Sequence, residues 1–207
     1  PKQSSICNRL GNVYYHMEKY NESLKQYEKA LEHEPMNEFY LSNIGGAYDM
    51  LKQYDKAIEY FNKALEVDPK QSSICNRLGN VYYHMEKYNE SLKQYEKALE
   101  HEPMNELYLS NIGGAYDMLK QYDKAIENYN KALEVNPTNA GNWNSIGLLH
   151  FNQSKFNDAA SCFMKATEIK PEEPVYWANL GDSYDGMGKK KEAQNAYNEA
   201  SKLGYQI

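Results

Sequence analysis

The sequence has no apolar run long enough to cross a membrane, only three cysteines, and only two arginines among 23 basic residues. The first absence argues against a membrane protein. Three cysteines without paired spacing predict a reducing compartment, so we expect a cytoplasmic protein in which the cysteines pack as small apolar side chains. A net charge of −6 without a stripe of lysine and arginine argues against nucleic acid as the partner, because phosphate binding requires clustered positive charge.

Motifs for catalysis are also lacking. The sequence contains no glycine-rich phosphate loop, no paired metal-ligand spacing and no nucleophile beside a general base. His33 and His101 fall near the ends of predicted helices, where we expect them at the surface. We therefore expect no enzyme, no cofactor and no metal site.

The sequence does contain a duplication, because residues 1–68 recur as residues 69–136 with four changes. These are Phe39 to Leu107, Tyr60 to Asn128, Phe61 to Tyr129, and Asp68 to Asn136. Positions that must face water are copied as faithfully as the others. The sequence therefore indicates either a late gene duplication or an engineered tandem.

A shorter period of 34 residues runs through the whole chain and divides it into six repeats, at 4–37, 38–71, 72–105, 106–139, 140–173 and 174–207. Tyrosine follows the glycine of each repeat by three residues, except that His150 takes this place in the fifth, where we expect it to pack between helices. Each repeat carries an aliphatic residue followed by glycine at the same position: Leu10-Gly11, Ile44-Gly45, Leu78-Gly79, Ile112-Gly113, Ile146-Gly147 and Leu180-Gly181.

Further downstream, every repeat has a small residue, an aromatic residue and an alanine in phase, as in Ser23, Tyr27 and Ala30. A proline ends each of the first five repeats. This pattern resembles the tetratricopeptide repeat family, whose opening tryptophan is present as Trp143 and Trp177. The resemblance implies an all-α fold, a right-handed superhelical α-solenoid of six helix-turn-helix repeats in a single domain, 1–207.

Capping residues predict the helix starts. Asn37, Asn105 and Asn139 precede the first helices of their repeats, and Pro174 suits a first helical turn. Five residues should cap the second helices in the same way: Asn21, Asp55, Asn89, Asp123 and Asn157. The glycine of each repeat should let its two helices approach closely.

The two ends of the sequence suggest one alternative function. Residues 1–3 match the tail of a repeat, so the chain begins within the motif, and residues 204–207 follow the last helix without an obvious capping helix. Solenoids usually need polar terminal caps. A structural protein that associates with itself by end-to-end stacking is therefore one hypothesis, with a homo-oligomer as its product.

The resemblance implies a second function, a scaffold whose concave groove binds a peptide segment of another protein. In this family the groove is lined by the second, fifth, sixth, ninth, twelfth and thirteenth residues of each repeat. Repeat five turns apolar there, at Leu148 and Phe151, and repeat six turns acidic, at Asp182 and Asp185. The residues predicted to bind peptide are Asn8, Arg9, Asn12, Tyr15, His16, Phe39, Asn43, Asp49, Asn76, Arg77, Asn80, Tyr83, His84, Asn111 and Asp117.

The two arginines, Arg9 and Arg77, stand at the same groove position of repeats one and three. A guanidinium suits bidentate contact with a carboxylate, phosphate or carbonyl, so the duplication predicts two equivalent contact sites. Another reading is that they form ion pairs with Asp49 or Asp117 on the next repeat. Asn43 and Asn111 offer amides that can meet a peptide backbone.

A third hypothesis is a co-chaperone adaptor that binds an acidic carboxyl-terminal tail. Some members of the family do this through two lysines, two asparagines and one further cation. Asn12, Asn43 and Arg77 match three of these positions, but Asn8 and Ser73 replace both lysines. The sequence therefore favours a peptide-binding scaffold over the adaptor.

Overall fold

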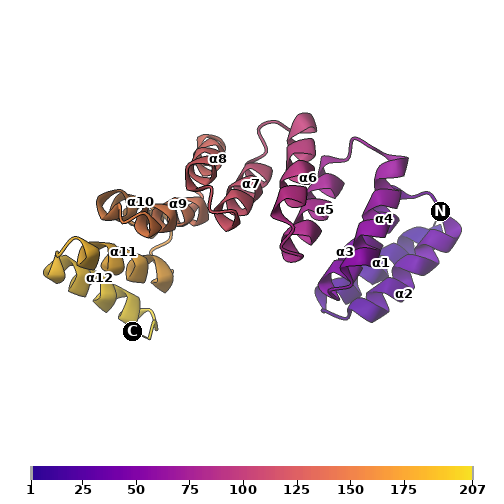
Figure 1. The fold of residues 1–207 in the computed structure, drawn as a ribbon. Coiled ribbons are helices and arrows are strands. Elements are labelled where there is room, and N and C mark those ends of the chain that lie inside the picture. The colour runs from indigo at the N-terminus through magenta and orange to yellow at the C-terminus, as the bar shows by residue number, and fades with distance from the viewer. Residues whose placement is uncertain (1, 207) are drawn as a thin grey trace. The chain divides into compact units, whose positions relative to one another are not determined.

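The computed structural model describes residues 2–206, which form twelve α-helices and no strand (Figure 1). The helices come in antiparallel pairs, one pair to each predicted repeat. Their bounds are α1 Lys2–His16, α2 Tyr20–His33, α3 Glu38–Met50, α4 Tyr54–Val67, α5 Ser72–His84, α6 Tyr88–His101, α7 Glu106–Met118, α8 Tyr122–Val135, α9 Ala140–Asn152, α10 Phe156–Ile169, α11 Pro174–Gly186 and α12 Lys190–Lys202.

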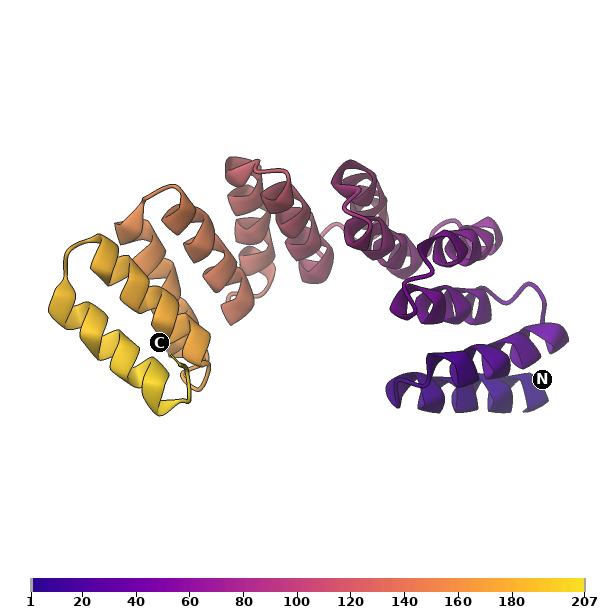
Figure 2. The ribbon, with the colours of Figure 1, turned by 60° about the horizontal axis from the view of Figure 1, so that its bottom comes forward.

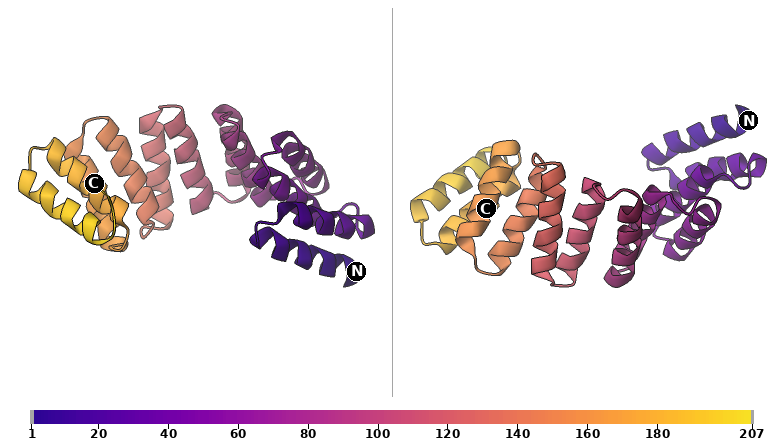
Figure 3. Two further views of the ribbon diagram at one scale, coloured as in Figure 1. Left: turned by 90° about the horizontal axis from the view of Figure 1, so that it is seen from below. Right: turned by 90° about the horizontal axis from the view of Figure 1, so that it is seen from above.

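The chain divides into two compact units, with the boundary between Pro103 and Met104. Unit 1 contains α1 to α6 and unit 2 contains α7 to α12. Each unit is a stack of three helix pairs, which can be followed by colour in Figures 2 and 3.

Within each pair, the repeat glycine brings the first helix onto an aromatic ring of the second. A Cβ atom added at Gly11 would lie 2.5 Å from the Tyr27 ring, and one at Gly45 would lie 3.0 Å from the Phe61 ring. Neither distance leaves room for a side chain. The same relation holds in all six repeats, so the predicted role of this glycine is confirmed.

Between pairs, the second helix of one repeat packs against the first helix of the next. In unit 1, Ala57, Phe61 and Ala64 of α4 form a buried cluster with Ile74 and Leu78 of α5. In unit 2, Tyr129 and Leu133 of α8 pack in the same way with Ile146 and Leu149 of α9. The apolar stripes of neighbouring repeats therefore form the core of each unit.

The helix starts follow the prediction for the first helices only. The Asn37 side chain accepts hydrogen bonds from the amides of Phe39 and Tyr40, and Asn105 and Asn139 cap α7 and α9 likewise. The capping prediction for the second helices was wrong. These helices begin at a tyrosine, phenylalanine or lysine, one residue before the predicted capping position, and have no side-chain cap, so Asn21 and its counterparts lie inside the first turn.

Two of the three free cysteines, Cys75 and Cys162, are buried, and Cys7 is half-buried. Burial raises the pKa of both buried thiols, that of Cys162 to about 11. These two therefore pack as small apolar side chains, as predicted. Among the helices between residues 2 and 206, none combines the length and the apolar character that crossing a membrane requires.

Candidate peptide-binding face

We call the surface formed by the predicted groove positions of the first helices the first-helix face. Thirteen of the fifteen predicted residues belong to unit 1, where α1, α3 and α5 carry them. The remaining two, Asn111 and Asp117, lie on α7 in unit 2.

Side-chain contacts join neighbouring first helices in unit 1. Asn43 Nδ2 donates to Asn8 Oδ1 at 3.0 Å, which links α3 to α1. Arg77 Nη1 donates to Ser42 Oγ at 2.9 Å, and His84 Nδ1 lies 3.0 Å from Asp49 Oδ1, so α5 is linked twice to α3.

Arg77 is held on several sides. Its guanidinium carbon lies 5.5 Å from the centre of the Phe61 ring, within the range of a cation–π interaction. One of its nitrogens lies so close to Gly46 that a Cβ there would overlap it. Tyr15 of α1 is also near: burial raises the pKa of Tyr15, and Arg77 opposes that rise. The guanidinium thus joins three first helices.

Arg9 stands at the same position of its repeat, yet its surroundings differ. The side chain is exposed, and among residues 2–206 it forms no hydrogen bond or ion pair. The alternative of an ion pair between Arg9 and Asp49 is therefore wrong, because Asp49 contacts His84 of the following repeat instead. The two arginines are not equivalent.

The other predicted residues differ in how far the fold engages them. Asn12 and Asn80 accept hydrogen bonds from the Tyr27 and Tyr95 hydroxyls at 2.8 and 2.7 Å, so each fixes the second helix of its own repeat. Burial raises the pKa of Tyr95 to about 12. Those left more open to solvent are Phe39 and His16. The rings of Tyr15 and Tyr83 rest edge-on against Tyr20 and Tyr88, while Asn76 is buried.

The three positions that resemble a chaperone-tail clamp are engaged inside the protein. Asn12 bonds Tyr27, Asn43 bonds Asn8, and Arg77 bonds Ser42. Asn8 and Ser73 supply no cation where that clamp has lysines. The co-chaperone alternative therefore gains nothing from the geometry.

In unit 2, the first-helix face keeps only part of this arrangement. Asn179 Nδ2 donates to Asn144 Oδ1 at 2.8 Å, as Asn43 does to Asn8. Asp182 accepts from the Tyr197 hydroxyl at 2.8 Å. His150 turns a buried Nδ1 inward without a hydrogen-bond partner in the described structure, and burial lowers its pKa. The predicted packing role fits this placement.

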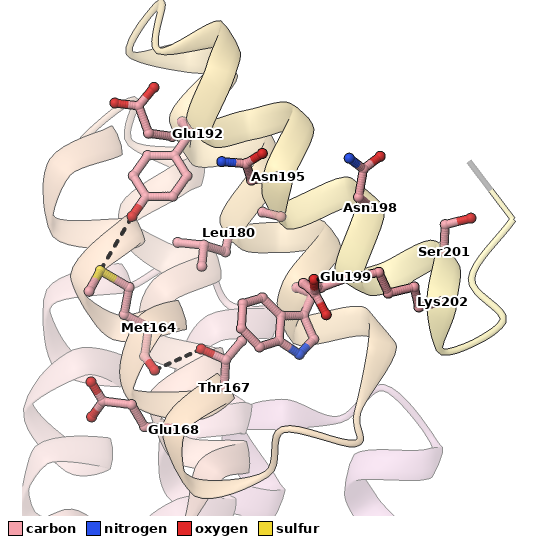
Figure 4. Close-up of a pocket in the computed structure, with 13 residues that line it drawn as sticks. Met164, Thr167, Glu168, Leu180, Glu192, Asn195, Asn198, Glu199, Ser201 and Lys202 are labelled. Atoms are coloured by element: carbon pink, nitrogen blue, oxygen red, sulfur yellow. Dashed lines mark hydrogen bonds and ion pairs between the residues drawn. The ribbon is translucent and has the colours of Figure 1, made fainter.

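Unit 2 also contains an open pocket of about 1000 Å³ that the sequence did not reveal. It lies between α10, α11 and α12, and its apolar lining includes Trp177, Leu180 and Ala196. Glu192, Asn195 and Lys202 are among the polar side chains around it (Figure 4). The one feature of the sequence that could have indicated the pocket is the small residue Ala196, at a position where α4 has Tyr60 and α2 has Gln26.

Sequence reasoning also missed the second-helix contribution to the face. Phe61 of α4 supports Arg77, and the Tyr54 ring lies 6.3 Å from that of His84. Both positions lie outside the six positions of each repeat that the family resemblance assigns to the groove. Across residues 2–206, no three histidine, cysteine or acidic side chains gather as metal ligands would.

Comparison with protein-family models identifies the family to which the chain belongs. The model of the Cilia and flagella-associated protein 70 C-terminal domain, a tetratricopeptide-repeat domain, matches residues 40–206, and the Tetratricopeptide repeat model matches residues 4–70. The chain therefore belongs to the tetratricopeptide repeat family. A comparison with curated proteins found no match.

Solved structures agree on the all-α solenoid fold. PilW, described as a widely conserved type IV pilus biogenesis factor, is 21% identical over all of this chain and 96% of its own, with a TM-score of 0.86. Pseudomonas aeruginosa pilF is 16% identical over 98% of this chain and 92% of its own (TM-score 0.84). YrrB, described as a TPR protein with an unusual peptide-binding site, is 24% identical over 86% and 92% (TM-score 0.68).

Proposed function

We propose that this chain is a protein–protein interaction scaffold that binds a peptide segment of its partner on the first-helix face of unit 1. The observation that carries the proposal is Arg9. Its guanidinium is exposed and has no partner among the described residues, while the same side chain in the next copy, Arg77, is engaged by the fold.

The surroundings of Arg9 supply the other elements of a peptide site. Phe39 on α3 is 59% exposed and offers an apolar contact. The bonded amides of Asn8 and Asn43 keep donor and acceptor capacity for a peptide backbone. A guanidinium, an exposed aromatic ring and fixed amides suit a segment with an acceptor group beside an apolar side chain. The peptide-binding site named for YrrB is consistent with this use of the fold.

The proposal can be tested by selecting peptides from a random-sequence display library and measuring their affinity by isothermal titration calorimetry. Arg9→Ala and Phe39→Ala change exposed side chains, so the fold should be unaffected. We expect Kd to rise about tenfold for each, as loss of a charge-assisted hydrogen bond or an anchor ring implies.

Lys29→Ala on the exposed side of α2 is the matched control, since it removes one positive charge outside the face. Its Kd should equal that of the unchanged chain. Failure to select any peptide, or a peptide whose affinity falls with Lys29→Ala but not with Arg9→Ala, would overturn the proposal.

A second candidate, self-association, is favoured by the outer side of α1. Ile6, Leu10 and Val13 of α1, with Met17 directly after the helix, form a stripe whose exposed fractions are 64%, 40%, 53% and 53%. In α5, the identical stripe is covered by α4. We infer that α1 accepts a helix with an apolar stripe, supplied by the α1 helix of a second copy.

Helix α12, the last helix of unit 2, is a poor partner for the apolar stripe of α1. Leu24, Ile58, Leu92 and Ile126 occupy one position of the second helix in repeats one to four, and in α12 the residue there is Gln194. Ser201 likewise replaces leucine one heptad further on. Both are exposed, so α12 has a polar outer side of the kind that closes a solenoid.

Light scattering over a hundredfold dilution tests the second candidate. A dimer that dissociates on dilution, and that Leu10→Lys abolishes while Gln194→Lys leaves it intact, is the expected result. A monomer at every concentration would reject it, and an oligomer lost with Gln194→Lys would assign the contact to α12.

A further inference from the structure

The duplication provides an internal comparison for one part of the first-helix face. In unit 1, α3 carries Ser42, Gly46 and Asp49 on one side of the helix, at spacings of four and three. Arg77 of α5 bonds Ser42, and His84 of α5 contacts Asp49. Two basic side chains of the next repeat therefore cover this triplet.

In unit 2, α7 carries the copied triplet, Ser110, Gly114 and Asp117, but the following helix is not a copy. Where α5 has Arg77, α9 has Ser145. Where α5 has His84, α9 has Asn152. The triplet is thus retained after both basic residues that cover it have been replaced.

The polar atoms of the copied triplet show the consequence. Ser110 Oγ is enclosed and has no hydrogen-bond partner in the described part of the chain, whereas Ser42 Oγ accepts from Arg77. The Asp117 carboxylate is half-buried, and within residues 2–206 its side chain forms no hydrogen bond or ion pair. Burial raises its pKa, as expected for a carboxyl group that loses water without gaining a cation.

The space beside Gly114 is more open than the space beside Gly46. A Cβ atom at Gly46 would overlap the Arg77 guanidinium, but a Cβ at Gly114 would meet only the Tyr129 hydroxyl, at 3.5 Å. Tyr129 replaces Phe61, the ring that supports Arg77. Unit 2 therefore retains an aromatic ring at this position but has no arginine to pack against it.

We propose that Ser110, Gly114 and Asp117 of α7, with the Tyr129 ring of α8, bind the guanidinium of an arginine side chain carried by a partner protein. That group would take the place that Arg77 takes in the first copy. In that place a planar guanidinium can donate to the Ser110 hydroxyl while it lies against the Tyr129 ring, and its positive charge compensates the Asp117 carboxylate on the same side of α7. This proposal rests on the proposed scaffold function, because a protein bound to the scaffold would supply the arginine.

The direct test uses N-acetyl-arginine amide as a probe, titrated into the ¹⁵N-labelled chain and followed by chemical shifts. The matched control is N-acetyl-citrulline amide, which has nearly the same shape without the charge. We expect saturable shifts at the amides of Ser110, Gly114 and Asp117, and binding of citrulline at least about tenfold weaker. Asp117→Asn should weaken arginine binding to a similar degree.

Two reciprocal substitutions separate this site from non-specific attraction to an acidic protein. Ser145→Arg supplies the arginine from the chain itself, so it should raise Tm and remove probe binding. Asn130→Arg, on the exposed side of α8, adds the same charge elsewhere and should leave probe binding intact. Arg77→Ser opens the corresponding place in unit 1, so Tm should fall and be partly restored by the arginine probe but not by citrulline.

Equal binding of arginine and citrulline, or arginine binding that survives both Asp117→Asn and Ser145→Arg, would overturn the proposal. If the probe fails while library peptides still depend on Arg9, the arginine site is rejected and the proposed scaffold function stands. If the probe binds as expected while no peptide is selected, the site stands and the scaffold function is rejected.

Discussion

Helices α1 and α5 have the same sequence from Ser4 to His16 and from Ser72 to His84, but the structure places them in different surroundings. Ile74, Leu78 and Val81 are 3%, 2% and 0% exposed, because α4 covers them. Ile6, Leu10 and Val13 are 64%, 40% and 53% exposed. Identical residues thus belong to the core in one copy and to the surface in the other.

The comparison teaches that in this chain a residue's role depends on the repeats before and after it. The second helix of the preceding repeat buries the apolar side of a first helix, and the first helices on either side decide which polar groups on the face are paired. The duplicated positions therefore serve as matched pairs, in which the same substitution can be made in two environments.

The largest expected difference is between Leu78→Ala and Leu10→Ala. The first leaves a cavity in a closed cluster and should lower the free energy of unfolding by about 2–5 kcal/mol. The second removes a side chain that is 40% exposed and leaves no closed cavity, so it should cost about 1 kcal/mol or less. Urea unfolding, with amide hydrogen exchange to locate the loss, measures both. Equal losses would mean that α1 is covered in solution.

A smaller difference is expected between Arg77→Ala and Arg9→Ala in the absence of any ligand. Arg77 loses its bond to Ser42 and its contact with Phe61, which should cost about 1–3 kcal/mol. Arg9 has no such contacts, so its replacement should stay within about 0.5 kcal/mol. Thermal unfolding followed by circular dichroism distinguishes them, and a matching fall in Tm for both variants would contradict the structural difference.

Gly114→Ala and Gly46→Ala test whether the place beside the glycine is occupied. Alanine is favoured over glycine inside a helix by about 1 kcal/mol, and Gly114 has room for a Cβ. We therefore expect Gly114→Ala to raise Tm. Gly46→Ala should gain less or lower Tm, because the new methyl group displaces the Arg77 guanidinium. A larger gain at Gly46 would refute this reading.

The smallest expected effect concerns Asp117 and depends on pH. Burial raises the Asp117 pKa in the folded protein above its value in the unfolded chain, so stability falls as pH rises through the interval between the two values. Asp117→Asn removes this cost and should give a slightly higher Tm at pH 7, with the gain vanishing at acidic pH. Asp49→Asn, which removes the partner of His84, should not stabilise the protein at either pH.

Much of the fold could be predicted because the same pattern of packing residues recurs in all six repeats. The glycine facing an aromatic ring, the asparagine caps of α3, α7 and α9, and the helix pairs all follow from local sequence. The starts of the second helices could not be predicted from capping residues, because their first turns begin directly after a tight turn and use no side-chain cap.

The candidate site was predictable in its positions but not in its pairing. Family resemblance placed Arg9, Arg77, Asp49 and Asp117 on one kind of helix face. The resemblance assigned the same role to both copies of each residue, because it considers the position within one repeat and not the side chains of the neighbouring repeat. The structure shows that Arg77 of α5 donates a hydrogen bond to Ser42. It also shows that Ser110 Oγ has no hydrogen-bond partner among the described residues, with α9 as its neighbour.

By itself, the sequence determined the helical repeat, its period and the residues that turn toward each neighbouring helix, because these depend on contacts within about 34 residues of chain. Only the tertiary structure decided which identical residues are buried, which arginine is held and which carboxylate has no cation. Those properties depend on the side chains that adjacent repeats bring together, and adjacent repeats differ even where the repeat itself is copied.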